Sequence, residues 1–273
     1  MEKAFFKAIG RFISLCVEKS CKAMTQKHYT KEEWSARCEL AALYRLIAYY
    51  RMTDLIDTHI SLRIPGDNEH FLINRYGIAF DRMRASDLVR IDKSGNVQDL
   101  NFTDLAVNAA GFVIHSAVHH AREDMACVIH THTAAGVAVS AQKEGLLPIS
   151  QHALKYYNRI AYHTYEGIAL SPDERERLVA DLGTHRAMIL RNHGLLTGGP
   201  TVKHAFHEIY MLERACQIQV QAMSGGSELN IPSEEVCLRT AAQFQRDDSE
   251  HIITIAWDAA LSLIEDQASS YAS

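Results

Sequence analysis

The spacing of apolar residues along the chain switches between two periods, about 2 residues as in strands and about 3.6 residues as in helices. In HISLRIP (59–65), the apolar residues Ile60, Leu62 and Ile64 alternate with other residues, which predicts a half-buried strand. The segment EEWSARCELAALYRLIAYY is apolar-rich and begins just after Thr30, with Glu33 three residues beyond that threonine. This capping-box pair predicts a helix from residue 30 to about residue 52.

The rest of the chain continues this mixture of short strands and helices. Further strands are expected at 71–74, 87–92, 96–98, 127–132 and 160–165, and on both sides of a tight turn in AMILRNHGLLTGG (187–199). Helices are expected over 108–122, 134–144, 171–183, 201–223, 233–246 and 249–267. Because several strands are joined by turns, as at Lys93-Ser94-Gly95, we predict one α/β domain with a largely antiparallel sheet.

Composition narrows the classes of protein and of partner. The chain has 273 residues, of which 47% are hydrophobic and 22% charged, so it can bury a sizeable core. A formal net charge of -5 and the lack of a basic block give no reason to expect nucleic acid as a partner. The six cysteines form no CxxC pair, and no apolar run approaches the roughly 18 residues of a membrane span. We therefore expect a cytoplasmic protein with reduced thiols and no membrane contact.

The two ends of the chain differ from its middle. The N-terminal segment FFKAIGRFISLCVEKS is interrupted by charged residues such as Lys7 and Arg11, so it lacks a signal-peptide core. We expect an amphipathic leader helix over 1–29 that packs on the body or on a neighbouring subunit. A main domain is expected over 30–230, and helices over 231–273 are expected to pack on that same domain.

A metal site is suggested by CVIHTH (127–132). In a strand, residues i and i+2 point to the same face, so His130 and His132 can converge on one ion. A third histidine, His193, follows the apolar stretch AMILR and precedes Gly194, which suits a tight turn at a strand end. Three imidazoles with an open position are typical of a catalytic zinc site. Since the chain has 15 histidines, the alternative is that each is an ordinary hydrogen-bonded group.

The motifs HTHTAAGVAVSA, GLLPISQHAL and MILRNHGLL, with the spacing between them, resemble the class II aldolase/adducin family over about residues 54–223. TDLIDTHISLRI and FLINRYGIAF look closest to the head domain of adducins. The resemblance implies a three-layer αβα sandwich around a mostly antiparallel sheet. It also implies a four-fold homo-oligomer with sites between subunits, and zinc or another divalent metal held by His130, His132 and His193.

The chain departs from the sugar-phosphate aldolases that it resembles. Their catalytic glutamate falls on Gly111, and their phosphate-binding residues fall on Thr58-His59, Tyr76-Gly77 and Ala109-Ala110. A phosphate needs several donors, which alanine side chains do not supply. We therefore do not expect the usual cleavage of a sugar phosphate.

Other residues are candidates for the missing chemistry. Dehydratases and epimerases of the family carry an acidic catalytic residue near the position of His152, and histidine can move a proton at neutral pH. The alternative is that His152 lies on a pocket wall or at the surface. His115 can approach the metal through the gap left by Gly111, as a group that supports the ligands. Three further polar residues are expected in the pocket wall: Tyr76, Asn108 and Gln151.

Two functions remain open at this point. The first is a metal-dependent, lyase-type enzyme that acts on a small hydroxy-carbonyl substrate by retro-aldol cleavage, dehydration, epimerisation or decarboxylation. The second is a non-catalytic assembly module, as adducin heads are in the actin–spectrin skeleton. The intact histidine triad favours the enzyme, whereas the missing glutamate favours the module. In either case we expect a homo-oligomer, and a homotetramer is the expected state.

Overall fold

A computed structural model describes residues 29–99, 107–167, 172–246 and 249–273. The expected leader helix over 1–29 therefore lies, apart from Tyr29, outside the described residues. Seven strands form one sheet in the order β3-β2-β1-β4-β7-β6-β5, and all pairs are antiparallel except β5 with β6. The strands are β1 (His59–Arg63), β2 (His70–Asn74), β3 (Leu88–Asp92), β4 (Cys127–Thr131), β5 (Ala161–His163), β6 (Ala187–Leu190) and β7 (Gly194–Gly199).

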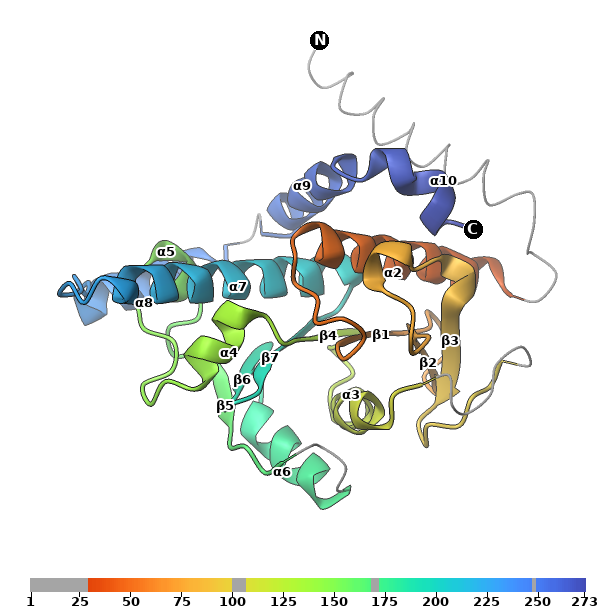
Figure 1. Cartoon of the computed structure of the whole chain (residues 1–273), viewed down its shortest axis with the longest axis horizontal. Coiled ribbons are helices and arrows are strands. Elements are labelled where there is room, and N and C mark those ends of the chain that lie inside the picture. Colours follow the sequence, from red (N-terminus) through yellow and green to blue (C-terminus); the bar gives the residue numbers. More distant parts are fainter. Residues whose placement is uncertain (1–28, 100–106, 168–171, 247–248) are drawn as a thin grey trace, which may run out of the picture.

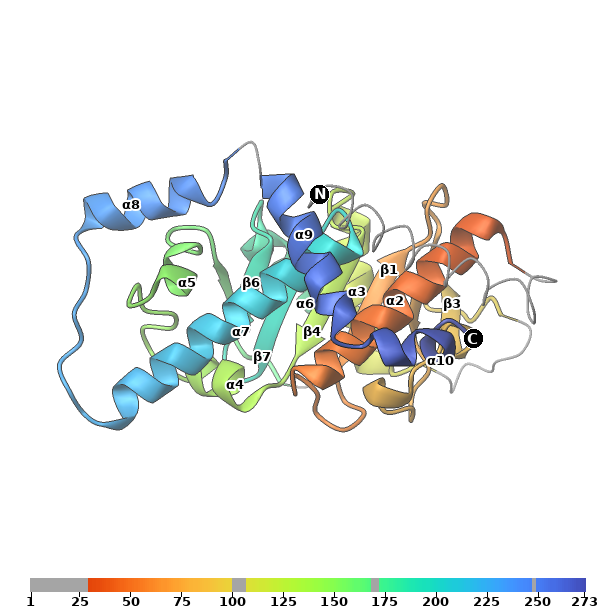
Figure 2. The same ribbon diagram turned by 90° about the horizontal axis from the view of Figure 1, so that it is seen from above.

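Helices cover both faces of the sheet (Figure 1). On one face lie α2 (Lys31–Tyr49), α7 (Val202–Ser224) and α9 (Ser249–Ser262), and on the other lie α3 (Ala109–Ala121) and α6 (Pro172–Leu182). Shorter helices are α4 (Ala134–Ser140), α5 (Gln151–Leu154), α8 (Glu234–Gln243) and α10 (Ala268–Tyr271). Figure 2 shows α5 between α7 and α8, away from the β3 edge. The predicted α/β sandwich with a mostly antiparallel sheet is confirmed.

Strand alternation divides the core between the two faces of the sheet. In β4, Cys127 and Ile129 join the large core beneath α2 and α7. Val128, on the opposite face, packs with Ile114 and Val118 of α3. His130 shares the face of Val128 because it is two residues further along the strand. The pattern of β4 therefore directs this histidine toward the α3 layer.

Capping side chains fix the starts of the long helices. The Thr30 hydroxyl accepts a hydrogen bond from the Glu33 N–H at 3.1 Å, and the Thr201 side chain accepts one from the His204 N–H. These bonds satisfy backbone donors that a helix N-terminus otherwise leaves free. Both helices therefore begin where the sequence predicted.

Three local predictions differ from the structure. Residues 96–98 form no strand and make a single bridge, between Val97 and Ile91, because the Asp92 carboxylate accepts hydrogen bonds from the Ser94 and Asn96 N–H groups and holds a turn. The helix expected over 249–267 ends at Ser262, and a 3₁₀ turn and α10 follow. The sequence also gave no signal for α5, which has only four residues.

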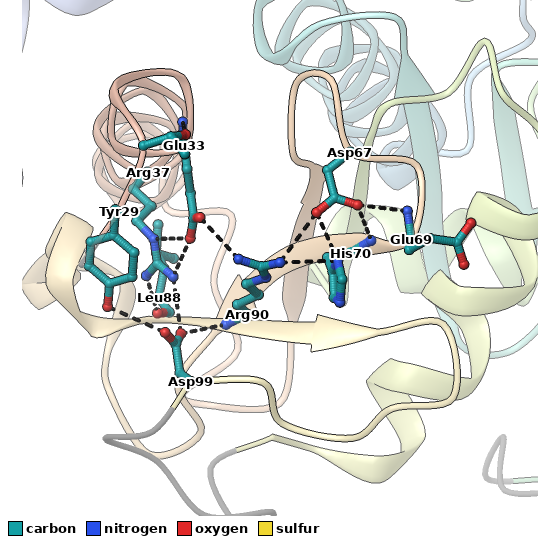
Figure 3. A network of polar contacts seen from close by, with 10 residues as sticks. Tyr29, Glu33, Arg37, Asp67, Glu69, His70, Leu88, Arg90 and Asp99 are labelled. Carbon is teal, nitrogen blue, oxygen red and sulfur yellow. Dashed lines mark hydrogen bonds and ion pairs between the residues drawn. The ribbon is translucent and has the colours of Figure 1, made fainter.

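A buried network of charged groups joins α2 to β2 and β3 (Figure 3). The Arg37 guanidinium, which is 0% exposed, donates to Glu33 Oε1 at 2.8 Å, to Asp99 Oδ2 at 3.0 Å and to the Leu88 carbonyl oxygen at 2.6 Å. The Arg90 backbone N–H donates to the same Asp99 oxygen at 2.8 Å. Each buried charge in this network has a partner of opposite sign, which a buried ion needs if it is not to destabilise the fold.

Candidate metal centre

The three predicted histidines converge at one end of the sheet. His130 lies in β4, His132 follows the end of that strand, and His193 occupies the turn between β6 and β7. The Nε2 atom of His132 lies 2.7 Å from Nε2 of His130 and 3.0 Å from Nε2 of His193. Together these residues form a group of potential ligands whose donor atoms all lie within 4.8 Å of one another.

The opposite ring nitrogens of two histidines are held by acceptors. Nδ1 of His130 lies 2.9 Å from the Leu195 carbonyl oxygen, and Nδ1 of His132 lies 3.2 Å from a carboxylate oxygen of Asp54. Since these oxygens only accept, each Nδ1 carries the proton and donates it. In the neutral rings, both Nε2 atoms then present lone pairs to each other. A cation between the lone pairs removes this conflict, which is the arrangement of metal-binding histidines with a supporting acceptor.

Burial keeps the imidazoles in the form that binds metals. Desolvation, with the charge of neighbouring histidines, holds the pKa of His130 well below its ordinary value. The same causes, burial first and then His132, lower the pKa of His193 to about 4. Metal ligation needs neutral imidazole, so these rings are ready to bind near neutral pH. Zinc takes histidine nitrogens at roughly 2.0–2.1 Å, so small ring rotations suffice for the three to share one ion.

His59 fills the space beside Gly111 that the sequence left open. A Cβ atom on Gly111 would lie 2.4 Å from Cδ2 of His59, far inside a normal contact. The His59 ring stacks on His130, with centroids 5.6 Å apart, and burial lowers the pKa of His59 to about 3. Neither His59 nitrogen has a hydrogen-bond partner among the described residues. The gap through which His115 was expected to approach is therefore occupied.

His115 lies one side chain further from the triad. Its ring meets the His59 ring edge to face at 5.6 Å, and its Nδ1 lies 2.6 Å from the Ser61 hydroxyl. The same hydroxyl lies 2.7 Å from Nε2 of His119. Burial, followed by the charges of His59 and His119, holds the pKa of His115 well below its ordinary value. The α3 face thus presents a layer of neutral, buried imidazoles behind His130.

A second histidine with acidic neighbours lies next to His193. Nδ1 of His163, in β5, lies 2.7 Å from a carboxylate oxygen of Asp181, and Nε2 lies 3.6 Å from Glu174. His163, Glu174 and His193 line one small cavity of about 10 Å³, close to the roughly 10–15 Å³ that one water molecule needs. The sequence gave no signal for this group, since a lone histidine in a short strand has no fixed spacing to a later helix.

The remaining predicted residues lie apart from the three rings. His152 is half-buried in α5, which packs against α7 and α8, and it makes no hydrogen bond to His130, His132 or His193. Gln151 is exposed and lines a different cavity. The Tyr76 side chain is 39% exposed, with its hydroxyl 3.5 Å from Asp57. Asn108 immediately precedes α3, and its carbonyl oxygen accepts the Phe112 N–H. Asp54, His59 and His163 are neighbours of the triad that sequence reasoning missed.

Comparison with known proteins gives consistent matches. The family model "Class II Aldolase and Adducin N-terminal domain" matches residues 38–220. A Caulobacter vibrioides protein with a provisional description as a class 2 aldolase is 47% identical over 243 residues, which are 89% of this chain and 94% of that protein. Rat alpha-adducin is 44% identical over 203 residues, which are 73% of this chain but only 28% of the adducin. The likeness to adducins is therefore real, but bacterial relatives match along more of the chain.

Solved structures agree with these matches. The crystal structure of an aldolase II superfamily protein from Pseudomonas syringae superposes with a TM-score of 0.87 at 50% identity, covering 91% of this chain and 99% of that one. An L-fuculose 1-phosphate aldolase from Glaciozyma antarctica gives 0.77 at 26% identity, covering 93% and 98%. Among the described residues, no helix is long and apolar enough to cross a membrane. The chain belongs to the class II aldolase and adducin N-terminal domain family.

Proposed function

We propose that the protein is a metal-dependent enzyme of the lyase type that acts on a small hydroxy-carbonyl compound without a phosphate group. The observation that carries this proposal is the convergence of three imidazoles whose Nε2 atoms face one point. Zinc is the first candidate for the metal, because three histidines and an open position are typical of catalytic zinc. A bound divalent ion would draw electron density from a substrate carbonyl and so make an adjacent carbon acidic.

The chain's own residues support the ligands in defined orientations. The Leu195 carbonyl and the Asp54 carboxylate hold the His130 and His132 rings by their Nδ1 protons. Such partners commonly change metal affinity by about 10–100-fold when they are removed. His59 packs against the opposite side of His130 and keeps water from that ring.

Two histidines are candidates for moving the proton. His163 lies beside His193, and Asp181 orients it through Nδ1, so its Nε2 faces the small cavity that Glu174 and His193 also line. A histidine held by a carboxylate is a common general acid or base. His152 is the candidate from the family resemblance. It serves the reaction only if α5 approaches the metal of a neighbouring subunit, which fits the proposed homotetramer.

The absence of phosphate in the proposed substrate rests on the chain's departures from sugar-phosphate aldolases. The Thr58 and His59 side chains, at a position where those enzymes bind phosphate, are buried at 0% and 3% exposure. The Glaciozyma relative is named for a sugar 1-phosphate, and its identity to this chain is 26%. We infer that this chain accepts a small substrate that lacks the phosphate group.

The test combines metal analysis with proton exchange. Zinc-loaded protein is mixed with dihydroxyacetone in deuterated water, and loss of the C–H signal is followed by proton NMR. We expect about one metal per chain and faster exchange with the wild type than with His193→Ala. His120→Ala is the matched control, because His120 is exposed and lies outside the triad. Faster turnover of L-fuculose 1-phosphate than of any phosphate-free compound would contradict the proposed substrate class.

The alternative is a non-catalytic assembly module. The observation in its favour is the 44% identity to rat alpha-adducin over 203 residues. A protein that retains no metal after purification and gives no exchange, yet forms a stable oligomer in sedimentation, would support the module over the enzyme. A stable monomer at micromolar concentration would contradict the homotetramer that we propose for both functions.

A further inference from the structure

A large cavity, separate from the metal centre, opens between α5, α7, α8 and α9. Its volume is about 1250 Å³, and none of the three triad histidines lines it. Small-molecule sites usually measure about 300–1,000 Å³, so an organic ligand fits with room for water. Its walls come from α5 and the residues that follow it, the turn before β6, the start of α7, and α8 with the start of α9. In Figure 2 these elements lie at the α5 and α8 end of the molecule.

Positive charge dominates the lining. Among the described residues that line the cavity, four are lysine or arginine, whereas one, Glu208, is a carboxylate. Lys155 forms an ion pair with Glu208 at 2.6 Å, which neutralises the negative charge of that carboxylate. The guanidinium groups of Arg159 and Arg186 line the same cavity. A concave surface with one sign of charge concentrates ions of the opposite sign.

Several of these groups lack a partner among the described residues. The Arg159 and Arg186 side chains make no hydrogen bond or ion pair to a described residue, and Nδ1 of His207 is buried without a hydrogen-bond partner. Burial, and then the charge of Lys155, lowers the pKa of His207 to about 4. Burial also lowers the pKa of Lys155, against the effect of Glu208. An anion in the cavity would relieve both effects, since it favours the charged forms.

Large apolar side chains also line the cavity. Leu238, Phe244 and Ile252 line it, and the Leu238 and Ile252 side chains are 47% and 41% exposed. Large apolar side chains left open to solvent beside a concave surface are typical of a ligand site. The cavity therefore offers both cationic groups and apolar surface.

We propose that this cavity binds a small organic anion, with its phosphate or carboxylate against Arg159 and Arg186 and its apolar body against Leu238, Phe244 and Ile252. Guanidinium groups suit both oxyanions because their N–H groups match two oxygens at once. The site does not depend on the metal or on the proposed reaction.

The test is isothermal titration calorimetry with three probes of similar size: phenyl phosphate, benzoate and benzyl alcohol. The full-length His193→Ala protein is used, so that binding at the metal centre does not contribute. We expect phenyl phosphate to bind, benzyl alcohol to bind at least roughly tenfold more weakly, and the affinity to fall as sodium chloride is raised. Whether benzoate equals phenyl phosphate distinguishes a general oxyanion site from a phosphate site.

Substitutions locate the site. Arg159→Gln and Arg186→Gln should each weaken phenyl phosphate binding by roughly tenfold or more, and Phe244→Ala should weaken phenyl phosphate but not inorganic phosphate. Lys143→Gln is the matched control, because Lys143 is exposed and does not line the cavity. Circular dichroism confirms that each variant is folded. No binding at 10 millimolar probe, unchanged affinity in both folded arginine variants, or equal binding of benzyl alcohol would each overturn the proposal.

Discussion

Two clusters of buried polar side chains lie on the same sheet and differ in how their groups are satisfied. Around Arg37, every buried charge meets a charge or carbonyl of the chain itself (Figure 3). Around His130, acceptors hold the outer Nδ1 atoms of His130 and His132, but the inner Nε2 atoms face one another. A closed cluster needs nothing further, whereas an open one calls for a ligand. The difference separates residues that hold the fold from residues that hold a metal.

The largest expected effect on stability comes from removing Arg37 from its buried network of ion pairs. Arg37→Ala leaves the Glu33 and Asp99 carboxylates without their main partner, and both side chains are nearly fully buried. Breaking a buried ion pair in this way typically destabilises a protein by about 3–5 kcal/mol. Urea denaturation of the metal-free protein measures the loss. The control is Lys93→Ala, because its pair with Glu69 is exposed and worth about 0–1 kcal/mol. A loss below 1 kcal/mol for Arg37→Ala would remove the distinction between the two clusters.

The second effect is the stabilisation that zinc should give when it binds the three histidines. Free zinc at 100 times its dissociation constant should raise the free energy of unfolding by about 2.7 kcal/mol, because the unfolded chain lacks the assembled site. His193→Ala should abolish this gain, since two histidines remain. His120→Ala should keep it, because His120 lies outside the triad. Thermal or urea denaturation with and without zinc gives the values. An equal gain in His193→Ala would place the metal elsewhere.

The residues around His130 also show which parts of the site could be predicted from the sequence alone. The His130–His132 pair was predictable because strand alternation is a local rule, and His193 because a turn after an apolar strand is also local. His59 was not predictable as a neighbour of His130, since only the antiparallel register of β1 with β4 places them opposite each other. No single-sequence pattern specifies that register.

The same reasoning explains the other residues that were missed. His163 meets Asp181 because α6 packs against β5, and Asp54 meets His132 across 78 positions of the chain. Such contacts depend on tertiary packing rather than on spacing. The overall sheet was easier to predict, because short alternating segments joined by tight turns already favour antiparallel pairing. The helix α5 was missed because four residues carry too little periodicity.

A third effect tests whether the Asp54 carboxylate, which accepts from the outer nitrogen of His132, increases the metal affinity. Asp54→Asn removes the charge that holds the His132 ring at 3.2 Å, so metal affinity should fall by about 10–100-fold. Competition with a chromogenic chelator measures the change. Asp57→Asn is the matched control, since Asp57 is an exposed aspartate three residues away whose carboxylate lies 3.5 Å from the Tyr76 hydroxyl. Equal affinities in the two variants would show that the Asp54 carboxylate plays no part in holding the metal ligands.

The smallest effect is a difference in acid sensitivity between the two sides of the sheet. His119, on α3, is fully buried, and burial followed by the Arg63 charge lowers its pKa to about 3; His120 also opposes its protonation. The unfolded chain has the ordinary histidine value of about 6.5. In the closed cluster, Asp67 has its pKa below 3.8, because hydrogen bonds from the Glu69 N–H and His70 outweigh the effect of burial. That carboxylate loses its contribution only in stronger acid.

The sign of the His119 contribution follows from proton binding. Between pH 6.5 and 3, the unfolded chain takes up a proton at this residue that the folded chain does not. The free energy of unfolding is therefore complete above pH 6.5 and falls as the pH decreases, by up to about 1.4 kcal/mol per pH unit. His119→Gln removes the titrating group and keeps a polar partner for Ser61, which also contacts His115. Urea denaturation between pH 7 and pH 4.5, in a His193→Ala background that removes metal linkage, should show a shallower slope for His119→Gln. Equal slopes would mean that His119 is protonated in the folded protein or that other groups control the acid sensitivity of this side of the sheet.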